Sequence, residues 1–480
     1  MASPAAASSV EINIPARMDR LPWSRFHVLV VFALGVTWVL DGLEVTIVGA
    51  LGPRLQDPRA LALTEADIGG LASAYLVGAV MGALIFGWLT DRYGRKIIFF
   101  VTLGLYVAGV LFSAFAWDFW SLAAFRLLTG VGIGGEYAAV NSAIDELIPA
   151  RLRGRVALIV NGSFWAGAAL GSLATVALLD PTLFAVDLGW RLGFGIGAAL
   201  GLLILLTRRF VPESPRWLAC HDRVEEGEAV VAEIERTIEA RAGGALPRAE
   251  GRIRIHPQKT FGFGLIFSTM FGRYRGRSAL VLLLMVAQAF LYNAIFFTYG
   301  LVLTKFYAVA PDHVGLYLVP FAIGNVVGPI VLGPFFDTVG RRRMIFMSYG
   351  VAGLLLFVTG WLFAIGALTA LTKTTAWCVI FFFASAAASA AYLTASEVFP
   401  LEMRALAIAA FYALGTAIGG VVAPYLFGLL IGSGEPWPIF WGYAGAAALM
   451  IVAGVAALLF GIDAEGKSLE DVAPPLSLAA

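Results

Sequence analysis

The 480-residue sequence is poor in charge, cysteine and histidine. Only 14% of its residues are charged and 60% are hydrophobic, whereas about 25% of a soluble domain is charged. So much apolar surface cannot be hidden from water within one fold, and we expect lipid to be its solvent. The two cysteines and four histidines are scattered, which argues against a disulfide framework or a metal-ligand cluster. We therefore expect neither a metal nor any other cofactor.

Excess charge of either sign is also lacking. Lys and Arg together number 33 and Asp and Glu number 32, which leaves a formal charge of +1. Nucleic acid is not an expected partner, because proteins that bind it carry clustered basic charge. An enzyme is the class we least expect, since no nucleophile–base pair or cofactor motif is visible. The G-x-G-x-x-G match at 130–135 lies inside an apolar stretch with no strand before it, so it is not a dinucleotide site.

Long apolar runs dominate the chain instead. A membrane-spanning helix needs about 20 mostly apolar residues. Twelve stretches qualify, at roughly 26–50, 68–90, 97–117, 119–143, 156–179, 190–207, 278–302, 313–336, 344–367, 375–396, 405–431 and 438–462. We expect an all-α membrane protein with an N-terminal six-helix bundle in 1–207 and a C-terminal one, with its tail, in 278–480. Between them, 208–277 is predicted to be a cytoplasmic linker with an amphipathic helix over 222–241, or alternatively a flexible tether.

Lys and Arg collect on one side of these spans. The N-terminal segment, the 208–277 linker and the polar loops after the second, fourth, eighth and tenth spans hold most of them. The side rich in Lys and Arg faces the cytoplasm. We therefore expect a multi-pass protein of the cell (inner) membrane with both termini in the cytoplasm.

Two charged signatures occur twice. Residues 87–96 read G-W-L-T-D-R-Y-G-R-K and 333–342 read G-P-F-F-D-T-V-G-R-R, while Glu-x-x-Pro-x-x-x-Arg starts at both Glu146 and Glu397. The copies lie about 250 residues apart, which indicates a doubled unit of the kind that transporters use for alternating access. Ordinary positive-inside anchoring explains the basic residues but not the recurring acids. We expect a cytoplasmic gate made of Asp91, Arg92, Arg95, Glu146, Arg153, Asp337, Arg341, Glu397 and Arg404.

Asp41, Glu44, Arg126 and Glu136 lie several residues inside the predicted spans, where inserting a charge costs roughly 2.5–3.5 kcal/mol. Asp41 and Glu44 share one helix face because they are three residues apart. Arg126 is the nearest obvious cation for these acids. A carboxylate that alternates between a proton and an arginine partner is a proton-coupling device, and a static ion pair that only fixes helix packing is the alternative. For Glu136, substrate contact and packing both stay open.

Polar side chains within the spans are the candidates for binding substrate. Amides both donate and accept hydrogen bonds, and together with aromatic rings they suit hydroxylated or carboxylated small molecules. Any one of them alone is more often a bond between helices. The candidate set is Glu136, Asn161, Gln288, Tyr292, Asn293, Asn325 and Tyr392.

On these signatures the chain resembles the major facilitator superfamily over almost its whole length. It is most similar to the sugar porters and to metabolite–proton symporters. P-E-S-P-R-W-L at 212–218 is typical of sugar porters and organic-ion transporters, and G-K-S-L-E at 466–470 matches the sugar-porter pattern. D-G-L-E at 41–44 resembles the D-G-[FY]-D of aromatic-acid and related proton symporters, and G-G-E at 134–136 resembles symporters of organic acids and osmolytes.

The resemblance implies roles for particular residues. Arg126 falls where sugar porters place the arginine that pairs with the acid of the first span. Tyr392 replaces a tryptophan of the sugar site, and the paired glutamines of the seventh span are here Ala287 and Gln288. The positions at which sugar porters hydrogen-bond sugar correspond here to Asn161, Gln288, Asn293 and Asn325.

We therefore expect a secondary active transporter that takes up a small polar metabolite, a sugar or an organic acid, together with protons. The alternative is an exporter of amphiphilic or cationic compounds that exchanges them for protons, and a receptor without flux is a third class. Its partners would be the small-molecule substrate, protons and membrane lipid, and we expect a monomer.

Overall fold

The computed structural model describes residues 10–55, 57–63, 65–178, 180, 182–207, 212–242, 246–249, 251–255, 263–296, 299–309 and 314–476. Helices make up nearly all of this part of the chain. Eight of the described helices are long and apolar enough to cross a membrane, and Ala74–Thr90 and Leu406–Gly420 are shorter apolar helices. The all-α membrane fold is therefore confirmed. Each of the twelve expected stretches overlaps a helix or two consecutive helices, while twelve crossings stay a prediction.

The first bundle contains helices that precede residue 208. They are α2 (Arg25–Leu55), α3 (Glu65–Tyr93), α4 (Arg95–Ser113), α5 (Phe119–Leu147), α6 (Arg153–Gly162), α7 (Phe164–Leu178) and α8 (Val186–Thr207). The 3-10 turn η1 (Ala150–Leu152) leads into α6.

The second bundle begins after the linker. It contains α12 (Arg275–Phe296), α13 (Tyr299–Tyr307), α14 (Val314–Thr338), α15 (Arg341–Ala364), α16 (Ala370–Glu397), α17 (Arg404–Gly415), α18 (Val421–Gly432) and α19 (Pro436–Phe460). The 3-10 turn η5 (Leu401–Met403) precedes α17, and the π-helical turn η6 (Thr416–Gly420) joins α17 to α18.

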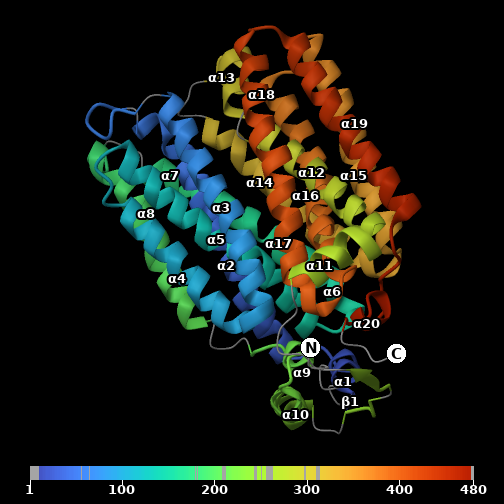
Figure 1. Ribbon diagram of the computed structural model, residues 1–480. Coiled ribbons are helices and arrows are strands. Elements are labelled where there is room, and N and C mark those ends of the chain that lie inside the picture. The colour runs from blue at the N-terminus through green and yellow to red at the C-terminus, as the bar shows by residue number, and fades with distance from the viewer. Residues whose placement is uncertain are drawn as a thin grey trace.

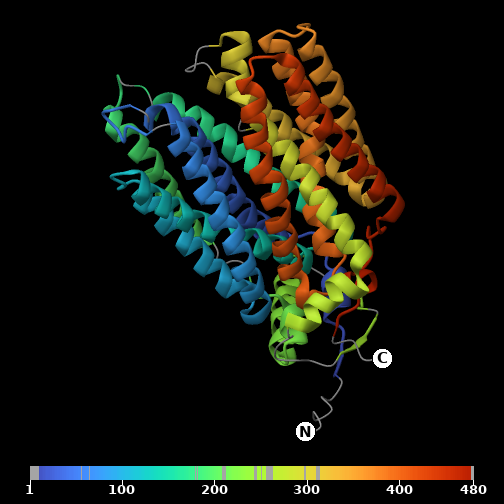
Figure 2. The ribbon, with the colours of Figure 1, turned by 45° about the horizontal axis from the view of Figure 1, so that its top comes forward.

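Figures 1 and 2 show the two bundles lying side by side. The contacts between them are made by α17 on α3 and α5, by α6 on α14 and α16, and by α7 on α14. Residues on these helices are therefore placed to respond when one bundle moves against the other.

Glycines allow the helices within each bundle to approach closely. A Cβ atom at Gly134 of α5 would overlap the carbonyl oxygen of Ala79 on α3, and one at Gly42 of α2 would overlap that of Phe164 on α7. Lipid supplies no hydrophobic drive for helix association, so close backbone packing of this kind has to supply the attraction. The glycine-rich stretch in α5 thus has a packing role.

Short elements lie together beyond one end of both bundles (Figure 1). Strand β1 (Val10–Ile12) pairs antiparallel with β2 (Ile253–Ile255), and α1 (Ile14–Asp19) packs against α9 (Pro215–Cys220) and α10 (Val224–Ala242). The linker also contains α11 (Phe263–Ser268) and the π-helical turn η3 (Thr269–Arg273), and α20 (Leu469–Val472) lies in the tail. The amphipathic helix expected over 222–241 is present as α10.

The N-terminal segment is held on α10 by charge. Arg17 donates to Glu235 over 3.0 Å, and Arg20 also pairs with Glu235. Partial burial alone would raise the pKa of Glu235, but the hydrogen bonds from Arg17 and Arg20 hold it below its ordinary value. The ion pairs of Glu235 with Arg17 and Arg20 therefore contribute their full stability at a pH above the pKa that Glu235 has in the unfolded chain. This contribution is lost as the pH falls through the lower pKa of Glu235 in the folded protein.

Candidate functional site

A buried ion pair joins α2 to α5. Arg126 pairs with Glu44, and both side chains are 3% exposed. The guanidinium also lies over the ring of Tyr75 on α3, with 4.6 Å between its Cζ atom and the ring centroid. Glu44 therefore has the partner that the sequence suggested, and the proton-coupling role of the pair stays a prediction.

Asp41 lies one turn before Glu44 and is bound by two tyrosines instead. Tyr75 on α3 donates to its Oδ1 over 3.2 Å, and Tyr137 on α5 donates to its Oδ2 over 3.0 Å. Asp41 is buried at 1% exposure. Each phenol can donate only one hydrogen bond, so these contacts stabilise the carboxylate and would be rearranged when Asp41 takes up a proton.

Three tyrosine rings meet where the two bundles touch beside Asp41. Tyr137 stacks on Tyr412 of α17, with ring centroids 4.5 Å apart and planes inclined by 16°. Tyr392 of α16 lies 5.9 Å from Tyr137, and Trp38 of α2 meets Tyr137 edge-on at 4.3 Å. Stacked and edge-on contacts are the preferred arrangements of aromatic rings, so these side chains form one aromatic cluster that spans the two bundles.

Glu136 lies next to Tyr137 on α5 and is also buried, at 2% exposure. A small cavity opens beside it, lined by Thr37, Trp38, Ile133, Glu136, Tyr137 and Val140. The structure thus gathers Asp41, Glu44, Glu136 and Arg126 around the inner face of α2 and α5. The position of Glu136 is compatible with both of its alternative roles, substrate contact and packing.

The predicted amide ligands are mostly engaged with the protein. Asn325 accepts from the Tyr292 hydroxyl over 2.7 Å and donates to its own helix at Phe321. Asn293 donates to the carbonyl of Ala289 over 2.7 Å. In this conformation the two amides therefore bond within α12 and α14 and between these helices.

Two further candidates complete the predicted set. Asn161 on α6 donates to Asn141 on α5 over 3.1 Å, and Gln288 is half-buried on α12. A second aromatic contact joins the bundles nearby, because Trp165 of α7 stacks on Tyr292 of α12 with centroids 5.5 Å apart. Of the predicted substrate residues, Tyr292 and Tyr392 therefore belong to aromatic contacts between the bundles.

The doubled signatures form matching ion-pair networks at the end where α1 and α9 lie. In the first bundle, Arg95 donates to Glu146 over 2.7 Å, and Arg404 of the second bundle lies 3.8 Å from the same carboxylate. All three side chains are at most 2% exposed.

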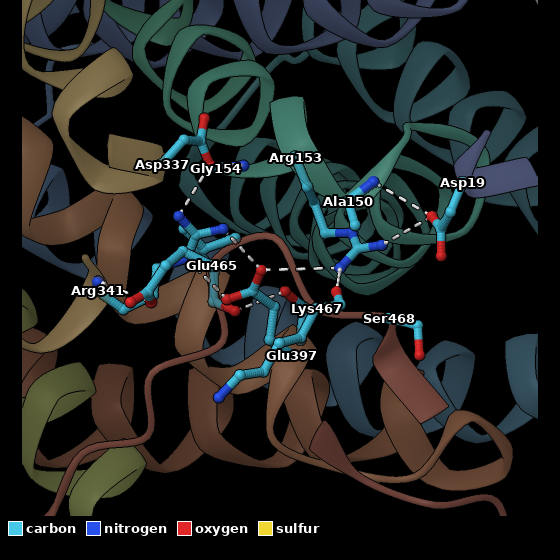
Figure 3. A network of polar contacts seen from close by, with 12 residues as sticks. Asp19, Ala150, Arg153, Gly154, Asp337, Arg341, Glu397, Glu465, Lys467 and Ser468 are labelled. Carbon is cyan, nitrogen blue, oxygen red and sulfur yellow. Dashed lines mark hydrogen bonds and ion pairs between the residues drawn. The ribbon is translucent and has the colours of Figure 1, made fainter. Parts of the chain in front are cut away.

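The second copy repeats this arrangement. Arg341 forms a two-pronged pair with Glu397, at 3.0 and 2.9 Å, and Arg153 of the first bundle lies 3.9 Å from Glu397 (Figure 3). Each glutamate is thus shared between an arginine of its own bundle and one of the opposite bundle. These shared pairs connect the two bundles at this end and would have to break for the bundles to separate there, while the gating role of the residues stays a prediction.

Asp337 adds a direct contact between the bundles (Figure 3). Its carboxylate accepts from the backbone amides of Gly154, at 3.1 Å, and Arg155, at 2.8 Å, which begin α6. Arg341 donates to the same side chain over 2.9 Å. The first amides of a helix lack partners within the helix, so a carboxylate from the opposite bundle satisfies them and favours the helix dipole.

The other two predicted gate residues are less informative. Asp91 lies in α3, but its side chain is outside the part that the structure describes. Arg92 is exposed and lies over the rings of Trp88 and Tyr93, at 5.3 and 5.5 Å.

Several charged residues near the gate escaped the sequence reasoning. Asp19 in α1 accepts from the amide of Ala150 over 3.2 Å and lies 3.6 Å from Arg153 (Figure 3). Arg216, in the 212–218 motif, pairs with both Asp19 and Glu470. Burial opposes the charge of Arg216, yet the two acids raise its pKa above the ordinary value. The motifs at 212–218 and 466–470 contain Arg216 and Glu470, so they are the sequence features that could have pointed to this pair.

The chain belongs to the sugar (and other) transporter family, whose model matches residues 49–474. It is 27% identical to the niacin transporter NiaP of Acinetobacter baylyi, over 96% of this chain and 100% of that one. It is 25% identical to the 4-hydroxybenzoate transporter PcaK of Pseudomonas aeruginosa, over 90% and 93%. The chain is therefore a transporter and not an enzyme.

Solved structures show the same fold. The proton:xylose symporter XylE of the major facilitator superfamily, bound to 6-bromo-6-deoxy-D-glucose, superposes with a TM-score of 0.76 at 18% identity, over 93% of this chain and 98% of that one. The partially occluded inward-open XylE of Escherichia coli gives 0.66 at 18% identity, over 92% and 100%. The protein is thus a multi-pass carrier with the major facilitator fold.

Proposed function

We propose that this transporter carries a small carboxylate with a flat ring into the cell together with protons. The supporting observation is the stack of Tyr137 on Tyr412, 4.5 Å apart across the two bundles, directly beside Asp41. Relatives named for niacin and 4-hydroxybenzoate support the same class, because both molecules are flat rings bearing a carboxyl group. A ring that enters this stack would touch both bundles at once.

Hydrogen bonding gives less support to a sugar. A sugar needs several donors and acceptors, whereas Asn325, Asn293 and Asn161 already bond to the protein. Breaking such bonds for a ligand costs free energy unless the ligand replaces them all. A flat ring that enters the stack would replace the contact of Tyr137 with Tyr412 by two contacts of the same kind, one with each tyrosine.

Charge balance explains how protons and a carboxylate could move together. Three buried carboxyl groups, Asp41, Glu44 and Glu136, act on one another in this part of α2 and α5, and Arg126 is the guanidinium paired with Glu44 there. An anion would be repelled while all three acids are ionised. When Glu44 takes up a proton it releases Arg126, which can then pair with the substrate carboxylate. Substrate and proton would therefore bind together.

The doubled networks would serve as the gate at the cytoplasmic end. Binding would weaken the pairs of Glu146 with Arg404 and of Glu397 with Arg153, so that the two bundles part and release substrate inside. We propose that residues 1–207 and 278–480 are the moving bodies, joined by the 208–277 linker, in the cell membrane with both termini in the cytoplasm. The basic residues of the linker and termini support this orientation.

A second candidate is exchange of an organic cation for protons. The same excess of carboxyl groups beside tyrosine rings suits a cation, since ring faces attract positive charge. In that case the ion pair of Glu44 with Arg126 would have to break without Arg126 binding a substrate carboxylate.

Ligand-induced stabilisation of the purified protein separates these classes. We expect nicotinate and 4-hydroxybenzoate to raise the unfolding temperature, because a ligand at a hundred times its Kd adds about 2.7 kcal/mol. The rise should be larger at pH 6 than at pH 8, because the proposed binding of the carboxylate takes up a proton. D-xylose and tetraethylammonium are the matched probes for a sugar and an organic cation.

Stabilisation by D-xylose but by neither carboxylate would contradict the proposed substrate class. Stabilisation by tetraethylammonium alone would favour the second candidate. Scintillation-based binding of labelled 4-hydroxybenzoate, with unlabelled nicotinate as competitor, checks that both carboxylates share one site.

A further inference from the structure

Tyr137 has contacts that no other side chain on Asp41 has. Its hydroxyl donates to Asp41 within the first bundle over 3.0 Å, and the face of its ring lies on Tyr412 of the second bundle at 4.5 Å. One rigid side chain thus touches both the acid and the opposite bundle. A phenol has only two side-chain torsions, so moving its ring also moves its hydroxyl.

Tyr75 provides the natural comparison. It donates to the other oxygen of Asp41 over 3.2 Å, but its ring lies against Arg126 of the same bundle. The two tyrosines therefore make equivalent bonds to one carboxylate and differ in whether the ring is held by the opposite bundle.

The helix that carries Tyr137 is connected to a neighbouring helix of its own bundle. Asn141 donates to the carbonyl of Tyr137 over 2.9 Å and accepts from Asn161 on α6 over 3.1 Å. A shift of α17 would therefore turn the ring of Tyr137 while α5 stays in place.

We propose that Tyr137 is a positioning residue that couples proton occupancy of Asp41 to the approach of the two bundles. The inference rests on the proposed proton-coupled transport. When α17 moves away, the ring of Tyr137 loses its partner and its hydroxyl no longer holds the Asp41 carboxylate. Asp41 then retains a proton more readily. When the bundles come together, the hydroxyl returns and favours release of the proton.

Other groups face Asp41 and act on the same equilibrium. Glu44 lies on its own helix, and Glu136 and Arg126 lie on α5. Tyr75 on α3 is its second donor, while Tyr392 and Tyr412 face it from the second bundle. A test must therefore isolate Tyr137 from the general charge around Asp41.

Infrared titration of the purified protein in lipid isolates it without a substrate. The absorption of the protonated carboxyl group of Asp41 is identified as the band that the Asp41→Asn variant lacks. Its loss on raising the pH gives a midpoint. Tyr137→Phe and Tyr75→Phe should each raise this midpoint by about one pH unit, because the carboxylate loses a donor while the ring remains.

A double-mutant cycle with Tyr412→Leu supplies the decisive comparison. Tyr412→Leu should raise the midpoint when Tyr137 is present and should leave it unchanged in the Tyr137→Phe background. In the Tyr75→Phe background, the effects of Tyr412→Leu and Tyr75→Phe on the midpoint should add. Tyr392→Leu, which removes the ring 5.9 Å from Tyr137, is the replacement if Tyr412→Leu fails to fold.

Each result decides the matter. No midpoint change in Tyr412→Leu, or an equal change with and without the Tyr137 hydroxyl, would overturn the inference. Proton-driven uptake of 4-hydroxybenzoate by wild-type proteoliposomes is measured in parallel. Its absence would contradict the proposed function, whereas uptake combined with an additive cycle would remove only the role of Tyr137.

Discussion

At the scale of single residues, several contacts between the bundles are made by carboxylates that bind groups of both halves. Asp337 is the clearest case, because its two oxygens satisfy the first amides of α6 across the interface while Arg341 holds it from its own bundle. An amide side chain at this position has one acceptor oxygen and no charge. Its second branch is an NH2 group, which cannot accept, whereas here each carboxylate oxygen accepts from one backbone amide.

We expect Asp337→Asn to speed hydrogen exchange at the amides of Gly154 and Arg155. Leaving a buried donor without its acceptor costs about 1–3 kcal/mol. The bond of Gly154 is only part-buried and that of Arg155 is exposed, so we expect the lower end of this range, roughly five- to tenfold faster exchange. Asp463→Asn is the control, since Asp463 forms only a half-exposed pair with Arg342 at 3.5 Å. Mass spectrometry of peptides from residues 150–160 measures both. Equal exchange in Asp337→Asn and wild type would show that the cap does not hold α6.

At the scale of elements, glycine determines how closely the helices approach and therefore which side chains meet. α3 carries Tyr75, and α5 carries Arg126 and Tyr137, so the spacing of these two helices sets the geometry around Asp41. Gly134 lies at their closest approach. A larger residue there would move the helices apart and with them the donors to Asp41.

We expect Gly134→Val to lower the unfolding temperature by several degrees and to weaken binding of 4-hydroxybenzoate. Overpacking costs typically 1–3 kcal/mol, and here the obstacle is backbone that cannot turn aside. Gly104→Ala on α4 is the matched control, because a Cβ atom there meets nothing within 4 Å and alanine favours a helix by about 1 kcal/mol. Differential scanning fluorimetry in detergent compares them. Unchanged unfolding of Gly134→Val would contradict the close packing of α3 and α5.

The elements were largely predictable from the sequence, and the contacts of Asp41 were not. Apolar length reveals a membrane helix directly, and the cost of burying charge singled out Asp41, Glu44 and Arg126. The two tyrosines on Asp41 could not be foreseen, because they depend on how α3 and α5 are rotated about their axes. Asp19 was missed for a related reason, since it lies in a polar segment whose docking leaves no periodic pattern.

At the scale of the whole molecule, the doubled sequence produces two matching ion-pair networks, which we propose act as the gate. Glu146 and Glu397 each hold one arginine from either bundle. Opening that end would break both shared contacts together, which makes the transition cooperative. The ring stack beside Asp41 lies on the same interface. In the proposed mechanism, proton binding, substrate binding and bundle movement would therefore meet along one surface.

The most direct test of proton-coupled transport compares net uptake with exchange for Glu44→Gln in proteoliposomes. Wild-type protein should accumulate labelled 4-hydroxybenzoate when the outside is at pH 6 and the inside at pH 7.5. Glu44→Gln should lose this accumulation yet keep exchange of internal for external substrate, because glutamine leaves Arg126 available to the carboxylate but carries no titratable proton. Full pH-driven accumulation by Glu44→Gln would contradict the proposed role of Glu44 in coupling.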